Sequence, residues 1–427
     1  MTQNTDATRP AWTVRGTDRD EYPEVLRVVG EALLIGEDLD AITERMRPLH
    51  DAAGYDRVLV AVEGEGPAEE VVGSTNHFPF EMALPGGPRA VAGVTGVGVW
   101  PTRRRRGVLS ALMRRQLADI HASGGRYAAL WASEGAIYDR FGYGAASMEM
   151  SATVRLPHTA LRADAPRDPA LEVELHQPGE VLAEMARVHR EVAAVQVGQF
   201  QRDDLWWSRI IRDVPEERAG RSPLKAAVVR GPDGPLGYAL YRTRADWEWG
   251  VGGPHGEVFV KELTATAPAA RTALYEHVLS RDLTTATHLE DVAVDDPLWS
   301  LVVDRQRIAA SVHTALWVRL VDVPGALSER SYAAPVEAVV EVSDRYAPWN
   351  AGRWRIGADR GGARVEPTQD APDVSLDVSH LGAAHLGQTS LTGYLRAGLI
   401  TEHVPGAVAG LDAALHRVDA PFCGRIF

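Results

Sequence analysis

One stretch of the chain, Val97–Ser110, constrains the fold more than any other. An apolar run typical of a strand ends at Pro101, and a loop with four consecutive arginines leads directly into a helix. Apolar residues recur in this helix at helical spacing, at Leu109, Leu112, Met113, Leu117 and Ile120. Gly124 and Gly125 then end it. The first N–H groups of a helix lack intrahelical partners and lie in a positive dipole field, so this stretch predicts a phosphate site.

Four consecutive arginines would also suit a solvated basic face. A phosphate cradle is the better interpretation, because the run lies between a buried strand and an amphipathic helix that fix its direction. Gly107 would let an anion approach the backbone closely. The segment 104–109 resembles the acetyl-CoA loop of the GNAT N-acetyltransferases, whose pattern is Arg/Gln-x-x-Gly-x-Gly/Ala. It matches at Arg104 and Gly107 and departs at Leu109, where the family has a small residue.

The composition limits the class of protein. A chain of 427 residues, 45% hydrophobic and 24% charged, is expected to form two or three globular domains. Its formal net charge of −13 argues against sequence-independent binding to nucleic acid and suits a cationic small-molecule substrate. No apolar run is long enough to span a bilayer, and Met1–Pro10 lacks a signal-peptide core. We therefore expect a cytoplasmic protein.

Cysteine and histidine usage predicts metal-free chemistry. Cys423 is the sole cysteine, which rules out an intrachain disulfide, and no local base marks it as a nucleophile. We expect it to be a small buried residue near the chain end. The 14 histidines form no His-Glu-x-x-His motif and no pairing with cysteine, so no metal site is predicted.

The chain contains a weak internal repeat. A shift of 162 residues places the helix 109–120 on 271–282 and the strand 127–131 on 289–293. With two more residues of shift, the segments 71–73 and 154–156 fall on 235–237 and 318–320. The common order of strands and helices predicts an α/β unit used twice. In the second copy Gly107 becomes Ala269 and Arg104 becomes Thr266, so we expect one active and one structural unit.

The pattern changes after about Asp322. Short strands are expected at 336–342, 353–356, 363–366 and 374–378, and helices at 391–399 and 407–416. This third unit carries no catalytic signature, so we interpret it as a scaffolding or lid domain.

A second motif, 131–144, follows the phosphate loop. Ser133 is a good N-cap for a short helix that Gly142 would end, and Tyr138 lies on that helix. The matching residue of the second copy is Ser300. A tyrosine with an ordinary pKa of about 10 stays protonated at neutral pH and can donate a proton to a departing thiolate. We therefore favour a catalytic over a packing role for Tyr138.

Together, these motifs resemble the Eis (enhanced intracellular survival) family of GNAT acetyltransferases. The likeness includes Val-x-Val-x-Pro-Thr before the arginines, Ser-Glu-Gly-x-Ile-Tyr-x-Arg-Phe-Gly-Tyr-Gly, and a final phenylalanine. It implies an α/β (α+β) fold with an active GNAT domain at 1–157, a degenerate GNAT domain at 158–322 and a sterol-carrier-protein-like domain at 323–427. It also implies a homohexamer and a C-terminal tail that returns to the first domain.

The resemblance assigns roles to individual residues. Tyr138 would be the general acid, and the terminal carboxylate of Phe427 the general base. A free α-carboxylate has a pKa near about 3.5, so burial or a relaying water would have to make it a more effective base. The acetyl-CoA contacts implied are Val97, Gly98, Val99, Arg105, Arg106, Gly107, Val108, Leu109, Ser110, Ser133 and Glu134.

The acceptor is less constrained than the reaction. Relatives that acetylate aminoglycosides surround the amine with acidic side chains, in some members at the penultimate position, which is Ile426 here. Glu37 and Asp38 remain candidates to hold a cation or to be a solvated helix end. We expect an acetyl-CoA-dependent N-acetyltransferase acting on an aminoglycoside or polyamine. The alternatives are a protein lysine N-acetyltransferase and a non-catalytic CoA- or lipid-binding scaffold.

Overall fold

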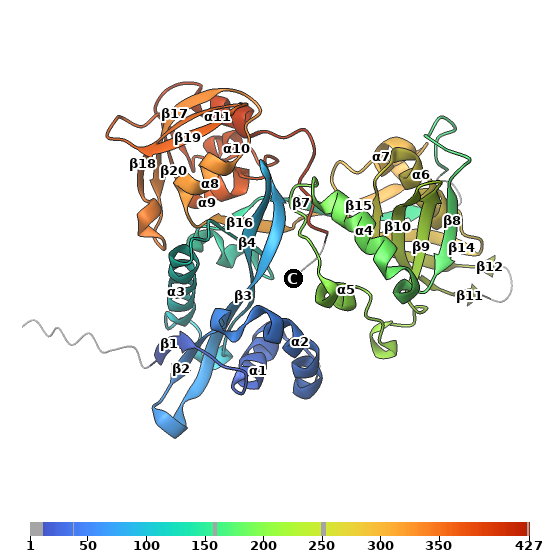
Figure 1. The fold of residues 1–427 in the computed structure, drawn as a ribbon, viewed down its shortest axis with the longest axis horizontal. Helices are drawn as coiled ribbons and strands as arrows, with labels where there is room; N and C mark the ends of the chain where they lie inside the picture. Colours follow the sequence, from blue (N-terminus) through green and yellow to red (C-terminus); the bar gives the residue numbers. More distant parts are fainter. Residues whose placement is uncertain (1–11, 37, 157–159, 249–252, 425–426) are drawn as a thin grey trace, which may run out of the picture.

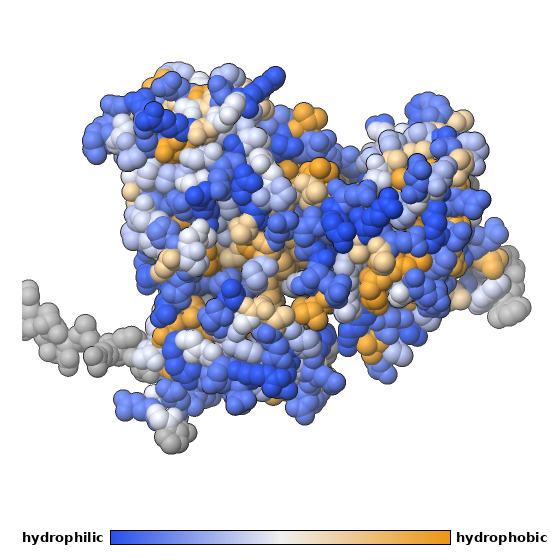
Figure 2. Space-filling model, in the orientation of Figure 1, coloured by the Kyte–Doolittle hydropathy of each residue, from blue (hydrophilic) through white to orange (hydrophobic). Residues whose placement is uncertain are grey.

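The computed structural model describes residues 12–36, 38–156, 160–248, 253–424 and 427. The candidate Glu37 and the penultimate residue Ile426 lie outside these described residues. Figure 1 shows three lobes, with the blue and cyan first lobe and the orange and red third lobe adjoining each other, and the green and yellow second lobe beside them. The C-terminal end lies between the first and second lobes (Figure 1). On the face drawn in Figure 2, hydrophilic side chains predominate, and apolar ones gather where the lobes meet.

The first lobe contains a sheet of seven strands among the described residues. In spatial order they are β1 (Trp12–Gly16), β2 (Leu59–Glu63), β3 (Glu70–Leu84), β4 (Gly87–Val99), β5 (Tyr127–Trp131), β16 (Leu316–Leu320) and β6 (Gly144–Ala145). Its helices are α1 (Tyr22–Leu33), α2 (Leu39–Ala53) and α3 (Val108–Ala122). The predicted helix 109–120 and strand 127–131 are confirmed by α3 and β5.

Side chains on β2 alternate between two helix layers. Val60 and Val62 pack with α1, whereas Leu59 and Ala61 pack with Leu112 and its neighbours on α3. This alternation follows from the two-residue period of a strand. The sheet thus lies between α1 with α2 on one face and α3 on the other.

The second lobe repeats this architecture. Its sheet, as far as the structure describes it, runs β15 (Ile308–Thr314), β7 (Met148–Arg155), β14 (Thr284–Ala293), β13 (Gly256–Ala265), β10 (Gly234–Arg244), β9 (Lys225–Gly231) and β8 (Glu172–His176). The remaining elements are α4 (Leu182–Ala193), α5 (Asp204–Ile210), α6 (Pro268–Leu279), α7 (Leu298–Leu301) and the ribbon β11 (Trp247–Glu248) with β12 (Gly253–Pro254). The repeated order of elements is therefore confirmed.

The two sheets exchange one strand. β7 comes from the first half of the chain and lies between β14 and β15, whereas β16 comes from the second half and lies between β5 and β6. The predicted repeat aligned 154–156 with 318–320, which lie at the ends of these two strands. A boundary at residue 157 therefore does not separate the two sheets.

The third lobe contains the sheet β19 (Gly362–Pro367), β18 (Gly352–Asp359), β17 (Val336–Ser343), β20 (Val374–Asp377) and β21 (Thr401–Glu402). Its helices are α8 (Val323–Glu329), α9 (Val378–Ala384), α10 (Leu391–Arg396) and α11 (Ala407–Leu415). All four predicted strands and both predicted helices are present. Helices α8 and α9 were not expected from the sequence. This lobe shares one apolar core with the first sheet, and Val318 and Val340 are among its members.

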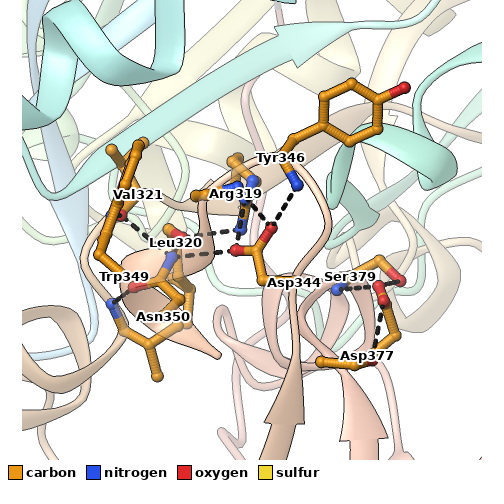
Figure 3. A network of polar contacts seen from close by, with 12 residues as sticks. Arg319, Leu320, Val321, Asp344, Tyr346, Trp349, Asn350, Asp377 and Ser379 are labelled. Atoms are coloured by element: carbon orange, nitrogen blue, oxygen red, sulfur yellow. Dashed lines mark hydrogen bonds and ion pairs between the residues drawn. The ribbon is translucent and has the colours of Figure 1, made fainter. Parts of the chain in front are cut away.

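A buried polar network also joins the third lobe to the first sheet (Figure 3). Nη2 of Arg319, on β16, lies 2.6 Å from Oδ2 of Asp344, and the two side chains are 0% and 1% exposed. Asn350 donates to the same carboxylate oxygen over 3.0 Å. The other oxygen accepts the backbone N–H groups of Tyr346 and Ala347. The network fixes the third lobe against the strand that the second half of the chain contributes.

Candidate active site

The predicted phosphate loop connects β4 to α3. Trp100 donates its N–H to the carbonyl of Val72 over 2.8 Å, which holds the loop against the sheet, and a single 3-10 turn follows. Gly107 has a φ of 87° and occupies the N-cap position of α3 without a side-chain cap. A residue with a Cβ rarely adopts this φ, so glycine suits the position. The first N–H groups of α3 are therefore left for a ligand.

A pocket of about 510 Å³ opens over this helix start. It brings together eleven of the thirteen predicted site residues: Val97, Gly98, Val99, Arg105, Gly107, Val108, Leu109, Ser110, Ser133, Glu134 and Tyr138. The list of implied acetyl-CoA contacts did not include the other six residues of the lining, which are Ala32, Leu33, Arg103, Arg104, Ile137 and Arg140. The four-arginine run pointed to Arg103 and Arg104, whereas Leu33 at the end of α1 reaches the pocket only through the tertiary fold.

The arginines of the loop divide into two groups. Arg104 and Arg105 line the pocket, and Arg105 has a φ of 64°. Arg106 does not line it: its Nη1 atom lies 3.6 Å from Oε1 of Glu63 on β2. Arg103 Nε lies 2.5 Å from Oε2 of the same carboxylate. Arg103 also lines the pocket, although Glu63 pairs with its charge, and Arg140 lines it together with Arg104 and Arg105, so the pocket attracts an anionic ligand.

The strands β4 and β5 separate at the site. They are parallel and pair at Ala92 with Ala128 and at Gly93 with Ala129. Within the described residues no further pairing joins them, although β4 continues to Val99. Peptide groups on a strand edge without a neighbour can bind an extended ligand in the manner of an added strand. Val97–Val99 line the pocket at this opening.

Tyr138 lies between two 3-10 turns, Gly135–Ile137 and Asp139–Phe141. The predicted cap is wrong: the N-cap of the first turn is Glu134, and neither turn has a side-chain cap, because two short 3-10 turns replace the expected helix. Gly142 ends the second turn with a φ of 82°, as predicted. The sequence pattern could not distinguish these turns from one short helix.

The environment of Tyr138 keeps its hydroxyl protonated. The side chain is 5% exposed and lines the pocket. Burial raises the pKa of Tyr138 to about 12, and the negative charge of Glu134 acts in the same direction. The ring packs edge-on against Tyr143 with 6.0 Å between centroids, which limits its movement. A protonated, oriented phenol in the pocket wall can serve as a general acid.

The chain end reaches the opposite face of the sheet. The Phe427 ring lies 4.9 Å from the Phe80 ring on β3 and 5.8 Å from the Phe200 ring of the second lobe, centroid to centroid. A Cβ built on Gly93 would lie 3.1 Å from the Phe427 ring, so the ring lies where β4 and β5 pair. Ala129 and Phe427 share one core, whereas Ala92 and Tyr138 share another. Phe427 and Tyr138 therefore lie on opposite faces of the sheet, next to the point where β4 and β5 separate.

Two further residues singled out in the sequence have structural roles. Asp38 is the N-cap of α2 and accepts the N–H of Asp40 over 2.9 Å, so the prediction of a helix end holds for it. Cys423 is 1% exposed, which confirms that it is buried. Among the described residues, no cluster of three or more His, Cys, Asp and Glu side chains could hold a metal ion. None of the described helices has both the length and the apolar composition needed to cross a bilayer.

The second lobe has the same fold as the first but lacks its phosphate-binding loop. Its helix α6 begins with Pro268, and Ala267 at the N-cap offers no side-chain cap. Arg271, the nearby cation, lies 3.4 Å from Asp296. Ser300, which replaces the tyrosine, lies on the single turn α7. Among the described residues, the second lobe therefore has no group of side chains that corresponds to the pocket of the first lobe.

Comparisons with known proteins agree with this architecture. Residues 13–146 and 198–320 each match an acetyltransferase (GNAT) domain family, and residues 323–424 match a sterol carrier protein domain family. An uncharacterized N-acetyltransferase of Streptomyces coelicolor is 38% identical over 94% of this chain and 95% of its own length. N-acetyltransferase Eis of Mycobacterium tuberculosis is 32% identical over 84% of this chain and 86% of its own length. The structure of Eis1 from Mycobacterium abscessus has a TM-score of 0.81 at 31% identity, and the match covers 97% of this chain and 100% of that one.

The fold and the site define a GNAT acetyltransferase with two acetyltransferase domains and a sterol carrier protein domain. This confirms the predicted fold class. The chain belongs to the Eis family of N-acetyltransferases, as its motifs indicated.

Proposed function

We propose that this enzyme transfers the acetyl group of acetyl-CoA to a primary amine of a cationic small molecule, such as an aminoglycoside or a polyamine. The observation that carries the proposal is one pocket that joins the uncapped start of α3, the Arg104 and Arg105 side chains and Tyr138. The net charge of −13 favours a cationic acceptor. The family resemblance supports a homohexamer, and a cytoplasmic location remains an expectation from the sequence.

The residues of the pocket fit the parts of acetyl-CoA. The N–H groups of Val108, Leu109 and Ser110 at the start of α3 would bind the pyrophosphate, with Arg105 neutralising its charge. The edge of β4 at 97–99 would hydrogen-bond the amides of the pantetheine arm. Ser133 and Glu134 line the pocket near Tyr138 and complete the binding site.

Two groups would move the protons of the reaction. The amine nitrogen forms a bond to the thioester carbon, and the carbon–sulfur bond breaks. The terminal carboxylate of Phe427 would accept the proton that the amine loses, directly or through a water, and the Tyr138 hydroxyl would protonate the departing thiolate. The product is an N-acetylated amine and CoA. The positions of Tyr138 and the Phe427 ring, on different faces of the strand opening, support this division of roles.

The test is release of the CoA thiol from acetyl-CoA, measured with spermidine, kanamycin and a lysine peptide, with mass spectrometry of each product. We expect acetylated spermidine or kanamycin. Acetylation of the peptide alone would replace the proposed acceptor class with a protein lysine. No thiol release with any acceptor would contradict catalysis.

The role of the chain end has its own test. Appending two residues after Phe427 moves the carboxylate away from the amine and removes no side chain. Because a displacement of about 1 Å costs about 10²-fold in rate, we expect kcat to fall at least that far, with acetyl-CoA binding unchanged. An extended enzyme that turns over at the original rate would show that the carboxylate is not the base.

A further inference from the structure

The C-terminal tail is bound along the second lobe before it reaches the first. Ala420 donates its N–H to Oδ2 of Asp295 over 2.8 Å, and its carbonyl accepts from Nε2 of Gln196 over 2.9 Å. Phe422 donates its N–H to the carbonyl of Val197 over 2.8 Å. The tail is therefore held by a series of hydrogen bonds to side chains and backbone of the second lobe.

Glu149 makes the last hydrogen bonds to the tail that the structure describes before Phe427. Its Oε1 atom accepts the N–H of Cys423 over 2.9 Å and the N–H of Gly424 over 3.2 Å. Two consecutive N–H groups that point at one oxygen form a small anion-binding nest. Gly424 has a φ of 69°, a left-handed conformation that suits glycine and sets the direction of the chain after the nest. The tail is thus shaped around this carboxylate.

The Glu149 side chain is fully buried, with 0% of its residue surface exposed. A buried carboxylate is costly unless it is well hydrogen-bonded, and N–H groups bind an ionised oxygen more strongly than a neutral one. Glu149 lies near the start of β7, the exchanged strand, which pairs with β14 and β15 of the second sheet. The carboxylate is therefore mounted on a rigid element.

We propose that Glu149 is a positioning residue for acetyl transfer: by binding the nest at Cys423 and Gly424, it fixes the point from which the chain end reaches the amine. The inference rests on the proposed role of the Phe427 carboxylate as general base. Three residues separate Gly424 from that carboxylate, a reach of at most about 11 Å. The Phe427 ring, packed on Phe80 and Phe200, holds the other end of this short span.

The test is Glu149→Gln, which keeps the side-chain volume and replaces one carboxylate oxygen with an amide NH₂ that cannot accept an N–H. We expect kcat with spermidine to fall about 10- to 100-fold at pH 7, with the KM for acetyl-CoA changed less than two-fold. An enzyme with a displaced base depends on amine that is already neutral, a fraction that rises about ten-fold per pH unit below the pKa of the amine. The defect should therefore shrink steeply between pH 7 and pH 9. A purely structural defect would not shrink with pH.

Gly424→Ala is the second variant, because it keeps Glu149 and disturbs the nest. A Cβ at this position would lie 2.7 Å from the Phe422 ring and would disfavour the positive φ. The Gly424→Ala enzyme should show the same pH-dependent loss of kcat. Asp295→Asn is the matched control: it weakens an acceptor of the tail at Ala420, farther from the chain end, and should change kcat less than three-fold.

The C-terminal extension separates the possible outcomes. If the extension abolishes transfer and both Glu149→Gln and Gly424→Ala show the pH-dependent loss, the positioning role is supported. If the extension abolishes transfer and these two variants turn over normally, or lose activity equally at every pH, the role of Glu149 is overturned and the proposed base stands. If the extension has no effect, the base assignment fails and the positioning role fails with it.

Discussion

The buried ion pair between Arg319 and Asp344 gives the sharpest stability prediction. Asp344→Asn keeps the shape of the side chain and an oxygen that can accept the N–H groups of Tyr346 and Ala347. It removes the negative charge 2.6 Å from the Arg319 guanidinium, which is 0% exposed and would then lack a counter-ion. Breaking a buried pair in this way costs about 3–5 kcal/mol of unfolding free energy, because the remaining charge is uncompensated.

That loss corresponds to a melting temperature lower by about 6–20 °C for a cooperative unit of about 150–250 residues. Differential scanning calorimetry of the full-length protein measures it. A second variant, Arg319→Met with Asp344→Asn, removes both charges and should melt at a higher temperature than Asp344→Asn alone. The reasoning is refuted if Asp344→Asn melts within 2 °C of the original protein, or if the double variant is the less stable of the two.

Three further predictions follow from the site and the core. Gly107→Val and Arg105→Ala should each raise the acetyl-CoA KM about 10- to 100-fold, because charge-assisted hydrogen bonds to the ligand are lost. Arg106 lies outside the pocket, so Arg106→Ala should change the acetyl-CoA KM less than two-fold. Steady-state assays measure both effects. Tyr138→Phe should lower kcat about 10²- to 10⁴-fold, whereas the acetyl-CoA Kd, measured by calorimetry, should stay the same. Near-normal turnover would show that Tyr138 is a packing residue. Burial lowers the pKa of His50 and of His77 to about 4, so the folded state binds fewer protons than the unfolded state between pH 4 and the ordinary value of about 6.5. The melting temperature should fall as the pH is lowered through that window, and His50→Phe should make the fall shallower; an equal slope in both proteins would contradict this.

The parts of the site that the sequence predicted are those encoded in contiguous stretches. The end of β4, the arginine loop and the start of α3 follow one another, so the sequence pattern placed Gly107 and the arginines at a phosphate site, and the family resemblance added Ser110. Arg106 belongs to the same run, yet it faces Glu63, because the direction of a loop side chain depends on a neighbour from another strand. Local pattern fixes the backbone of such a loop better than the orientation of each side chain.

Other features depend on contacts between distant segments. Leu33 reaches the pocket from α1, and Phe427 contacts Phe80, which precedes it by about four fifths of the chain length. The strand exchange was not predicted, because β7 and β16 have equivalent places in the repeat and either could complete either sheet. Only the packing of the lobes against each other determines the choice.

The exchange of β7 and β16 has a consequence for synthesis on the ribosome. β5 is complete at residue 131, and its neighbour β16 begins at residue 316, roughly 185 residues later. At a synthesis rate of about 5–20 residues per second, the edge of β5 stays unpaired for roughly 10–40 s. Such an edge can pair with another chain and aggregate, so the enzyme is expected to need chaperone protection until its second half emerges. A fragment that stops at residue 157 would keep that edge open permanently.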